Sequence, residues 1–450
     1  MTPRLLTTFR RPTRWRWVLW VALAGGFLLV NFHRVSTGVL SGPLAREFDA
    51  TGTELGFLHA SFFYIYAALQ LPSGLLVDRF GSRRVAAVGL LCMSAGVVGF
   101  AVSGSFLSAF LSRAVVGLGG SVLFIATLRY LANWYRPREF ATMTGLTVAA
   151  AGVGGVLATT PLALAVEATG WRNSMFAAAL VGFAFAVGVT VIVRDRPSAA
   201  GFDPIDGVTP PEGFPDLGTV ASNTRRVLAA PSTWLLGFVL FFLLGTNFTV
   251  LGLWGVPYIV HLYGVSVPRA SNYVLLGNLG LLVGAPAVGW LSDRIGRRVP
   301  IMFAAVCTFV LSYAVIFLTV TPPLAVVGAV LFAANFTAGG NVLAYAVVKE
   351  RHAAAASGTV TGTINSIGYF GAAVVPAAMG AVLDAYWTGE TVAGARVYTA
   401  LGYRVAFGIA VLSGLLSLAC LTWFYLRYVR EPSGNGSAPS PEAEVEAGED

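Results

Sequence analysis

The stretch Gly74–Arg84 of this chain reads GLLVDRFGSRR, and Gly289–Arg298, 215 residues further on, reads GWLSDRIGRR. Positions 74, 78, 79, 81 and 83 each find the same residue after this shift, which is nearly half of the 450-residue length. The same shift carries Pro161 onto Pro376. A repeat of this size, with one charged loop in each half, indicates a duplicated unit, and such duplication is typical of membrane carriers that work by alternating access.

The composition is that of a polytopic helical membrane protein. Hydrophobic residues make up 56% of the chain and charged residues 11%, whereas soluble domains carry roughly 45–50% and 25%. Apolar stretches of about 20 residues, the length that crosses the hydrocarbon core, recur along the sequence. We therefore predict an all-α fold with twelve spans, at about 17–40, 55–77, 85–104, 107–131, 141–165, 173–194, 232–256, 270–291, 300–320, 323–347, 355–380 and 403–427.

Lys and Arg are distributed unequally between the two sides of these spans. The side that carries the repeated loops holds 21 of the 29 basic residues, the other side holds five, and Arg34, Arg113 and Arg129 fall inside spans. Because cytoplasmic loops carry an excess of Lys and Arg, we predict a multi-pass protein of the cytoplasmic (inner) membrane with both termini in the cytoplasm. Basic charge confined to short loops beside spans argues against nucleic-acid binding. The three cysteines lie far apart within apolar segments and suggest neither a disulfide framework nor a metal site.

The span pattern divides the chain into five segments. These are a basic cytoplasmic N-terminus over 1–16, a six-helix bundle over 17–194, a cytoplasmic linker over 195–231, a second six-helix bundle over 232–427 and an acidic disordered tail over 428–450. The linker is rich in Pro, and we expect a short surface helix over 220–229 that presents Arg225 and Arg226 to lipid headgroups. The fifth and eleventh spans are rich in small residues, which favours close and movable helix packing, although Gly and Pro are also common in membrane helices generally.

The repeated loop resembles the signature of the major facilitator superfamily, G-x-x-x-D-R-x-G-x-R-R. The first copy fits it fully, and the second is one residue shorter after its Gly. The segment Arg113–Gly120, RAVVGLGG, is similar to the R-x-x-x-G-x-G element of the fourth span of that family. This likeness covers about residues 15–430. It implies an all-α polytopic membrane fold with two pseudo-symmetric six-helix bundles that rock around a central cavity.

The same resemblance implies a gating role for the charged loops, in which Asp78 and Asp293 lock the outward-open form and Arg113 serves structure or coupling. A carboxylate at this depth can cap a neighbouring helix and pair with an Arg, so the loops would bias a two-state element. The alternative is a plain topology signal. The predicted gating set is Asp78, Arg79, Arg83, Arg113, Asp293, Arg294 and Arg298. The fifth span reads GVGG over 152–155 and lacks the Pro of the antiporter element G-P-x-x-G-G, which weakens the case for proton-driven drug export.

The charges inside the spans suggest the substrate class. Three arginines lie there without an acidic residue in any span interior, and a charge in the bilayer costs at least about 2.5 kcal/mol on insertion scales. An electropositive cavity attracts anions, so we predict a small organic anion, a carboxylate or a phosphate ester. Arg34 is the leading contact, because Asn31–Ser36 is similar to the first span of organophosphate and anion–cation symporters. Alternatively, Arg34 pairs with a backbone carbonyl or with an acid near a span end.

Further candidates lie on the same and on opposing helices. Arg129 either binds substrate or extends to the interface. His33 and His59 are the predicted proton-coupling residues, since no interior carboxylate is available, although each can instead be a satisfied helix contact. Neutral polar side chains complete the predicted substrate-binding set, which is Arg34, Arg129, Tyr66, Gln70, Asn247, Asn278, Asn341, Asn365 and Tyr369. Asn335 is a further in-span amide of the same type.

These observations favour secondary active transport, with proton-coupled uptake of the anion as the leading hypothesis. Efflux of amphiphilic compounds and a transporter-like nutrient sensor remain open alternatives. An enzyme is not expected, because no nucleophile–base pair or metal cluster is visible, and no Walker element indicates ATP as the energy source. We expect no cofactor, and a small-molecule substrate, protons and the lipid bilayer as partners of a functional monomer.

Overall fold

The computed structural model describes residues 12–208, 217–319, 321–338, 340–349, 351, 357–392 and 395–430. Residues 431–450 of the expected tail (428–450), residues 1–11 of the basic N-terminus and residues 209–216 of the linker lie outside this range. Residues 428–430, which the tail was expected to include, are helical. Within the described residues, eleven helical segments are long and apolar enough to cross a membrane, and the bent pair α4 and α5 supplies a twelfth. The prediction of an all-α fold with twelve spans is therefore confirmed.

Each half of the chain supplies six spans. In the first half they are α2 (Pro12–Val35) with α3 (Thr37–Phe48), α4 (Gly52–Ala68) with α5 (Gln70–Phe80), α6 (Ser82–Ala101), α7 (Phe106–Gly120) with α8 (Leu123–Trp134), α9 (Pro137–Leu157) with α10 (Thr160–Thr169), and α11 (Trp171–Ile192). In the second half they are α13 (Pro231–Thr249) with the π-helical segment η2 (Val250–Trp254) and α14 (Gly255–Tyr263), α15 (Val267–Ile295), α16 (Arg298–Thr319), α17 (Leu324–Ala338) with α18 (Asn341–Lys349), α19 (Ser357–Ala385), and α20 (Ala400–Tyr425) with η4 (Leu426–Arg430). The linker holds η1 (Ser198–Ala200) and the surface helix α12 (Leu217–Ala229).

The second span is bent by 54° between α4 and α5. Pro72 explains the break, because proline has no N–H to donate and its ring clashes with the carbonyl four residues earlier in a helix. That carbonyl belongs to Ala68, the last residue of α4. The helix resumes at once, and Ser73 N donates to Leu69 O at 2.9 Å. The bend directs α5 toward the charged loop that follows it.

Both copies of the charged loop turn at a glycine. Gly81 has φ +83° and Gly296 has φ +68°, and only glycine adopts this left-handed region without strain. In the first copy the carboxylate of Asp195 also lies close, since a methyl group at Gly81 would lie 2.6 Å from its Oδ2. The repeated Gly of the sequence motif is thus a requirement of the turn.

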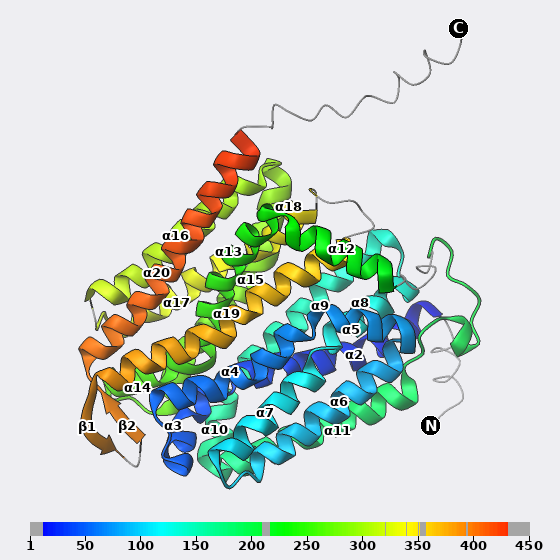
Figure 1. Ribbon diagram of the computed structural model, residues 1–450. Coiled ribbons are helices and arrows are strands. Elements are labelled where there is room, and N and C mark those ends of the chain that lie inside the picture. The colour runs from blue at the N-terminus through cyan, green and yellow to red at the C-terminus, as the bar shows by residue number, and fades with distance from the viewer. Residues whose placement is uncertain are drawn as a thin grey trace.

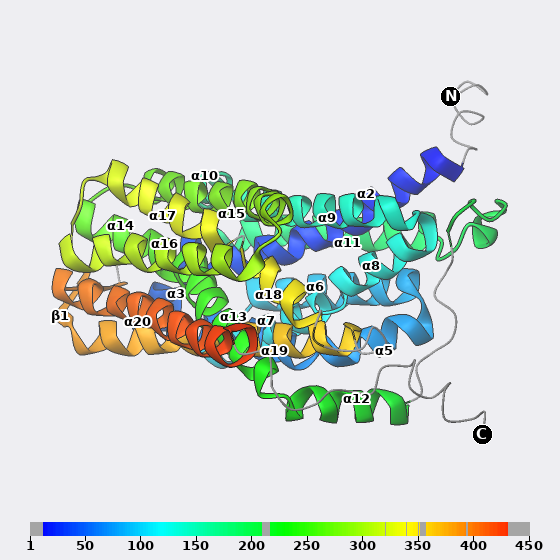
Figure 2. The same cartoon turned by 90° about the horizontal axis from the view of Figure 1, so that it is seen from above.

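The two halves lie side by side, one running from α2 to α11 and the other from α13 to α20 (Figures 1 and 2). We call the end of the molecule that carries the loops 78–84 and 293–298 the basic-loop end. The opposite end carries an antiparallel hairpin, β1 (Trp387–Val392) and β2 (Ala395–Tyr398), and we call it the hairpin end. The hairpin is an addition to the predicted fold, and its Trp, Thr, Val and Tyr residues are those that fit a pleated surface.

The halves meet most closely where α4 crosses α19 near the hairpin end. A methyl group at Gly56 would lie 2.5 Å from the Cα of Ala377, and one at Gly380 would lie 2.1 Å from the carbonyl oxygen of Gly52. Small residues permit this backbone approach, as they do at other helix contacts in membranes. The described state is therefore closed at the hairpin end.

Candidate functional site

The candidate site is centred on Arg34, in the last turn of α2. Its side chain is 2% exposed, and Nε and Nη2 have no hydrogen-bond partner among the described residues. Burying a charge without hydrogen-bond partners costs free energy, and a role in binding would explain why the chain keeps such a residue. Neither alternative for Arg34, a backbone carbonyl partner or a pairing acid, is found for these two nitrogens in the described part of the chain.

Aromatic rings surround this guanidinium. Its Cζ lies 4.2 Å from the ring centroid of Tyr66 and 4.9 Å from that of Tyr369. The rings of Phe62 and Phe248 lie within 5.8 Å and 5.6 Å. Two rings come from α4 of the first half and two from α13 and α19 of the second, so the cation is held where the halves meet. Attraction between a cation and ring faces lowers the cost of its burial.

Gln70 and Asn365 join the two halves on the basic-loop side of Arg34. Asn365 Nδ2 donates to Gln70 Oε1 at 2.6 Å, and Gln70 Nε2 donates to the carbonyl of Tyr66 at 3.2 Å. Tyr345 Oη in turn donates to Asn365 Oδ1 at 2.6 Å. The structure thus brings Arg34, Tyr66, Gln70, Asn365 and Tyr369 of the predicted substrate-binding set into one region.

Arg113 connects the two helices that carry the predicted proton-coupling residues. Its Nε donates to Leu58 O at 3.1 Å and its Nη2 to His33 O at 3.3 Å. The ring of His59 is fully buried, and both its nitrogens are without a hydrogen-bond partner among the described residues. His33 and His59 therefore lie at similar depth, beside a cation whose donors are directed at backbone carbonyls.

The remaining members of the predicted binding set lie elsewhere. Asn247 Nδ2 donates to Asn335 Oδ1 at 2.6 Å, which ties α13 to α17 within the second half. Asn278 Nδ2 donates to Val274 O, and the Asn278 amide oxygen lies against Gly155 of the other half. The side chain of Asn341 lies outside the described residues.

Arg129 is separated from Arg34 along the fourth span. Arg113 reaches the backbone beside Arg34, and Arg129 is sixteen residues further along, about 24 Å at the rise of an α-helix. Its Nε lies 3.4 Å from Asp78 Oδ1 in an ion pair within the first half. This pairing differs from both sequence-based interpretations, substrate contact and extension to the interface, because a carboxylate lies within reach on α5.

The other predicted gating residues also make local contacts at the basic-loop end. Arg83 donates from its backbone N to Asp195 Oδ1 at 2.8 Å and from Nε to Thr190 O at 2.9 Å, which fastens the loop to the end of α11. The guanidinium groups of Arg79 and Arg294 lie over the rings of Phe80 and Trp290. Asp293 and Arg298 line a polar cavity of about 660 Å³ in the second half, together with Ser292, Gly296, Val299, Val347, Arg351 and Val429.

Asp384 is a residue whose contact the sequence did not reveal. Its Oδ1 accepts from Gly52 N at 2.7 Å, and its Oδ2 accepts from Thr53 N at 2.8 Å and from Thr53 Oγ1 at 2.6 Å. It therefore caps α4 from the other half, 332 residues away in sequence. Arg396 of β2 lies 3.6 Å from the same carboxylate. The only signal for it was a lone acid near the end of the eleventh span.

Tyr398 completes this contact at the hairpin end. Its hydroxyl lies 3.0 Å from where a methyl group at Gly52 would stand. Burial, followed by the nearby Asp384 carboxylate, raises the pKa of the Tyr398 hydroxyl, so this side chain stays neutral.

The sequence also did not indicate Phe248 and Tyr345 as site residues, because single aromatic residues in Phe-rich spans cannot be told from core residues by sequence.

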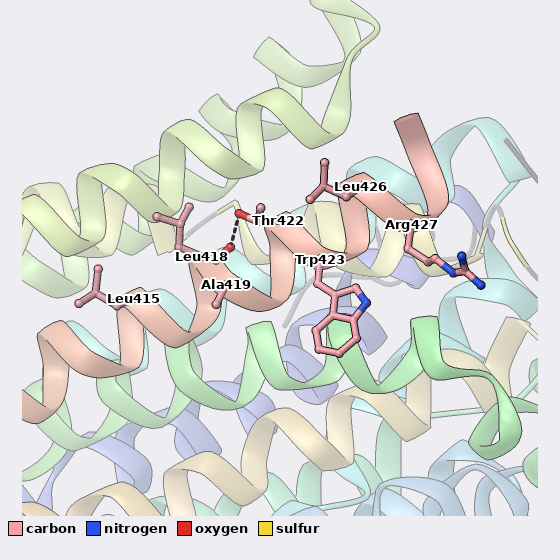
Figure 3. Close-up of a pocket in the computed structure, with 7 residues that line it drawn as sticks. All are labelled: Leu415, Leu418, Ala419, Thr422, Trp423, Leu426 and Arg427. Atoms are coloured by element: carbon pink, nitrogen blue, oxygen red, sulfur yellow. Dashed lines mark hydrogen bonds between the residues drawn. The ribbon is translucent and has the colours of Figure 1, made fainter. Parts of the chain in front are cut away.

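A groove of about 730 Å³ runs along α20 and is distinct from the Arg34 region. Figure 3 shows its lining side chains on one stretch of the helix, with the Thr422 hydroxyl bonded to the Leu418 carbonyl. The lining is mainly apolar, and Trp423 and Leu415 are exposed. An exposed apolar surface of a spanning helix is what contact with lipid requires, so the groove does not compete with Arg34 as the substrate site.

Known proteins resemble this chain over most of its length. A family model described as Major Facilitator Superfamily matches residues 22–376. The membrane sensor protein UhpC of Salmonella typhimurium is 26% identical over 394 residues, which cover 83% of this chain and 87% of that protein. The gentisate transporter of Corynebacterium glutamicum is 28% identical over 380 residues, 80% of each chain. A probable hexose phosphate transport protein of Chlamydia trachomatis is 24% identical over 407 residues, 84% and 88% of the two chains.

A solved structure shares the fold. It is that of a bacterial homologue of the human lysosomal transporter Spinster in an inward-facing and occupied conformation, with a TM-score of 0.73 and 18% identity over 93% of this chain and 99% of that one. The likeness shows that the two chains share their overall fold. Since the family model covers most of the sequence as well, the chain belongs to the Major Facilitator Superfamily.

Proposed function

We propose that this membrane transporter is a secondary active carrier for a small organic anion, a carboxylate or a phosphate ester, moved by alternating access across the cytoplasmic membrane. The observation that carries the proposal is the buried guanidinium of Arg34, whose Nε and Nη2 have no partner in the described part of the chain. An anion arriving between the halves would supply the missing acceptors through a charge-assisted, bidentate contact.

The relatives support an anion as substrate. Gentisate and hexose phosphate, which appear in the names of two of them, are both anions at neutral pH. The site adds electrostatic support, because Arg113 donates to the backbone carbonyl of His33, next to Arg34, so two guanidinium groups lie in the same region. The ion pair of Arg129 with Asp78 lies further along the fourth span.

We propose that transport is coupled to protons through His33 and His59 and that it runs as uptake. His59 is fully buried beside Arg113, and both of its ring nitrogens are available to gain or donate a proton. Each proton carried inward with the anion adds one positive charge to the transported load. A membrane potential of 100 mV contributes about 2.3 kcal/mol for each positive charge that moves inward. The membrane potential would then drive accumulation.

The mobile parts are the two halves, residues 17–194 and 232–427, with the basic-loop end in the cytoplasm. The described state is closed at the hairpin end by α4 and α19. In the other state the hairpin end separates and the loops containing Asp78 and Asp293 come together. Asp78, Arg79, Arg83, Arg113, Asp293, Arg294 and Arg298 remain the proposed gating set, and Arg129 joins it through its pair with Asp78.

Uptake into proteoliposomes tests the function. We expect radiolabelled anions to accumulate when an inward proton gradient is imposed, and Arg34→Gln to abolish accumulation. Arg225→Gln on the surface helix α12 is the matched control and should transport normally. Accumulation that is unaffected by Arg34→Gln would remove this residue from the site, and resistance of whole cells to amphiphilic compounds without anion uptake would favour efflux.

A sensor is the second candidate. Similarity to the membrane sensor protein UhpC over 83% of the chain favours it. Saturable anion binding that depends on Arg34, together with zero flux in the same vesicles, would support the sensor and reject the carrier. Counterflow of preloaded anion would decide for the carrier, because only a protein that changes its accessibility exchanges substrate across the membrane.

A further inference from the structure

We infer that the ligand of the Arg34 site is a monoanion whose body is a flat ring, that is, an aromatic carboxylate rather than a phosphate ester. This inference rests on the proposed function and narrows its substrate class. Three features of the described residues carry it: the number of available cations, the side chains around them, and the state of the neighbouring amides.

The first feature is the charge that the site offers. Arg34 has two guanidinium nitrogens without a partner, whereas Arg113 directs Nε and Nη2 to backbone carbonyls. Arg129 is paired with Asp78, about 24 Å along the span. One available guanidinium matches one carboxylate, with two N–H groups facing two oxygens. A phosphate ester carries close to two charges at neutral pH, and only one guanidinium with free donors is available to bond to it, because Arg113 already donates to backbone carbonyls.

The second feature is the ring lining. Phe62, Tyr66, Phe248 and Tyr369 lie beside the guanidinium, and Phe63 packs against three of these rings. We call these five side chains the aromatic cluster. Their centroids are 4.7 Å apart for Tyr66 and Tyr369, 5.2 Å for Phe63 and Phe248, and 5.8 Å for Phe248 and Tyr369. These are the separations at which rings stack or meet edge to face. The rings therefore contact one another in the described state, and a planar ligand ring that enters between the halves would replace one of these contacts with a contact of the same geometry.

The cluster also orients a ligand. Ring faces carry negative charge and attract cations, so they repel a carboxylate and favour its contact with the guanidinium. The uncharged body of the ligand is then left against the rings. Because Tyr369 and Phe248 belong to the second half while Phe62, Phe63 and Tyr66 belong to the first, a ring held among them would contact both halves.

The third feature is that the two amides nearest the cluster are already paired. The amides nearest the cluster, Gln70 and Asn365, bond to each other at 2.6 Å, and Tyr345 takes the remaining acceptor of Asn365. A sugar phosphate would bring several hydroxyl groups to this surface, and each buried hydroxyl without a partner is costly. An aromatic carboxylate brings few or none.

Binding to purified protein in nanodiscs tests the inference. The probes are benzoate, acetate, which has the same charge without a ring, and glucose 6-phosphate. We expect benzoate to bind at least about tenfold more tightly than either of the other two, since each aromatic pair adds to ring burial. Arg34→Gln should abolish benzoate binding, and Tyr369→Leu should lower benzoate affinity toward that of acetate.

Two further variants keep this test interpretable. Tyr369→Phe retains the ring and should keep benzoate affinity within about twofold, whereas Phe176→Leu, an exposed position on α11, should leave it unchanged. If glucose 6-phosphate or acetate binds through Arg34 as tightly as benzoate, the ring inference fails while the anion carrier stands. If no anion binds in an Arg34-dependent way, the proposed function itself fails.

Discussion

Replacing Asp384 by Asn should loosen the closed hairpin end. The carboxylate accepts three hydrogen bonds from the first turn of α4, at 2.6–2.8 Å, from the other half of the molecule. In Asn one of the two oxygens becomes an NH₂ group, which cannot accept from Thr53, and the negative charge at the helix N-terminus is lost.

The magnitude follows from these contacts. Hydrogen bonds to a charged group contribute about 1.5–3 kcal/mol, and a charge at a partly buried helix terminus contributes up to about 2 kcal/mol. Asn keeps one acceptor, so we expect a loss of about 1.5 kcal/mol from the closed state, which lowers its population relative to the open state roughly tenfold. Arg396→Gln should have a smaller effect of about 0–1 kcal/mol, because this ion pair is partly exposed.

Distances between spin labels on opposite halves measure this population. Leu107 at the start of α7 and Leu401 at the start of α20 are both exposed at the hairpin end, and labels there require replacement of the three native cysteines. Asp384→Asn should add a longer distance component. Glu390→Gln, which removes an exposed acid of β1, is the matched control. An unchanged distance distribution in Asp384→Asn, or an equal change in Glu390→Gln, would refute the capping argument.

Three more substitutions have expected outcomes. Gly56→Leu places a side chain where the backbone of α19 now lies, so it should open the hairpin end in the same spin-label measurement, or lower the thermal midpoint. Arg129→Gln should cost only about 0–1 kcal/mol because its ion pair is partly exposed, and adding Asp78→Asn should recover most of the loss in a double-mutant cycle of thermal stability. Asn365→Leu leaves Gln70 Oε1 without its donor and should cost about 1–3 kcal/mol in chemical unfolding.

Gly56→Leu has a matched control, and the other two substitutions have results that would contradict the argument. Gly104→Ala, where a methyl group meets nothing within 4 Å, should behave as wild type beside Gly56→Leu. Additive losses in the cycle of Arg129 and Asp78 would show that the two side chains do not interact. Unfolding of Asn365→Leu at the wild-type denaturant midpoint would show that the Gln70 bond contributes nothing.

The sequence predicted the fold well because its signals are local or repeated. Apolar runs report spans directly, and the loops at 74–84 and 289–298 report the duplication. Arg34 was recognised because a charge within an apolar run is rare and costly. The predicted limits of the spans were less accurate where a helix continues through a bend, as α2 and α3 do beyond the first predicted span.

Contacts between distant segments were beyond the sequence. The eight in-span amides and tyrosines named from the sequence looked alike, yet Asn365 meets Gln70 across the halves whereas Asn247 meets Asn335 within one half. The partner of each side chain depends on how its helix is rotated about its own axis. The spacing of apolar residues does not determine this rotation in a span that is apolar on all sides. The cap of α4 by Asp384 has the same origin, since it joins residues more than 300 positions apart.

The π-helical segment η2 inserts one extra residue into the helix of the seventh span. Gly252 within it lies against the His59 ring and the backbone carbonyl of Arg34, where a methyl group would lie at 2.6 Å and 2.8 Å. A π-turn holds one more residue than an α-turn, so sliding the extra residue along the span would rotate the intervening side chains by about 100° without breaking the helix. A shift of the π-turn along the seventh span would therefore change which of its side chains face His59 and Arg34, while both ends of the span stay in place.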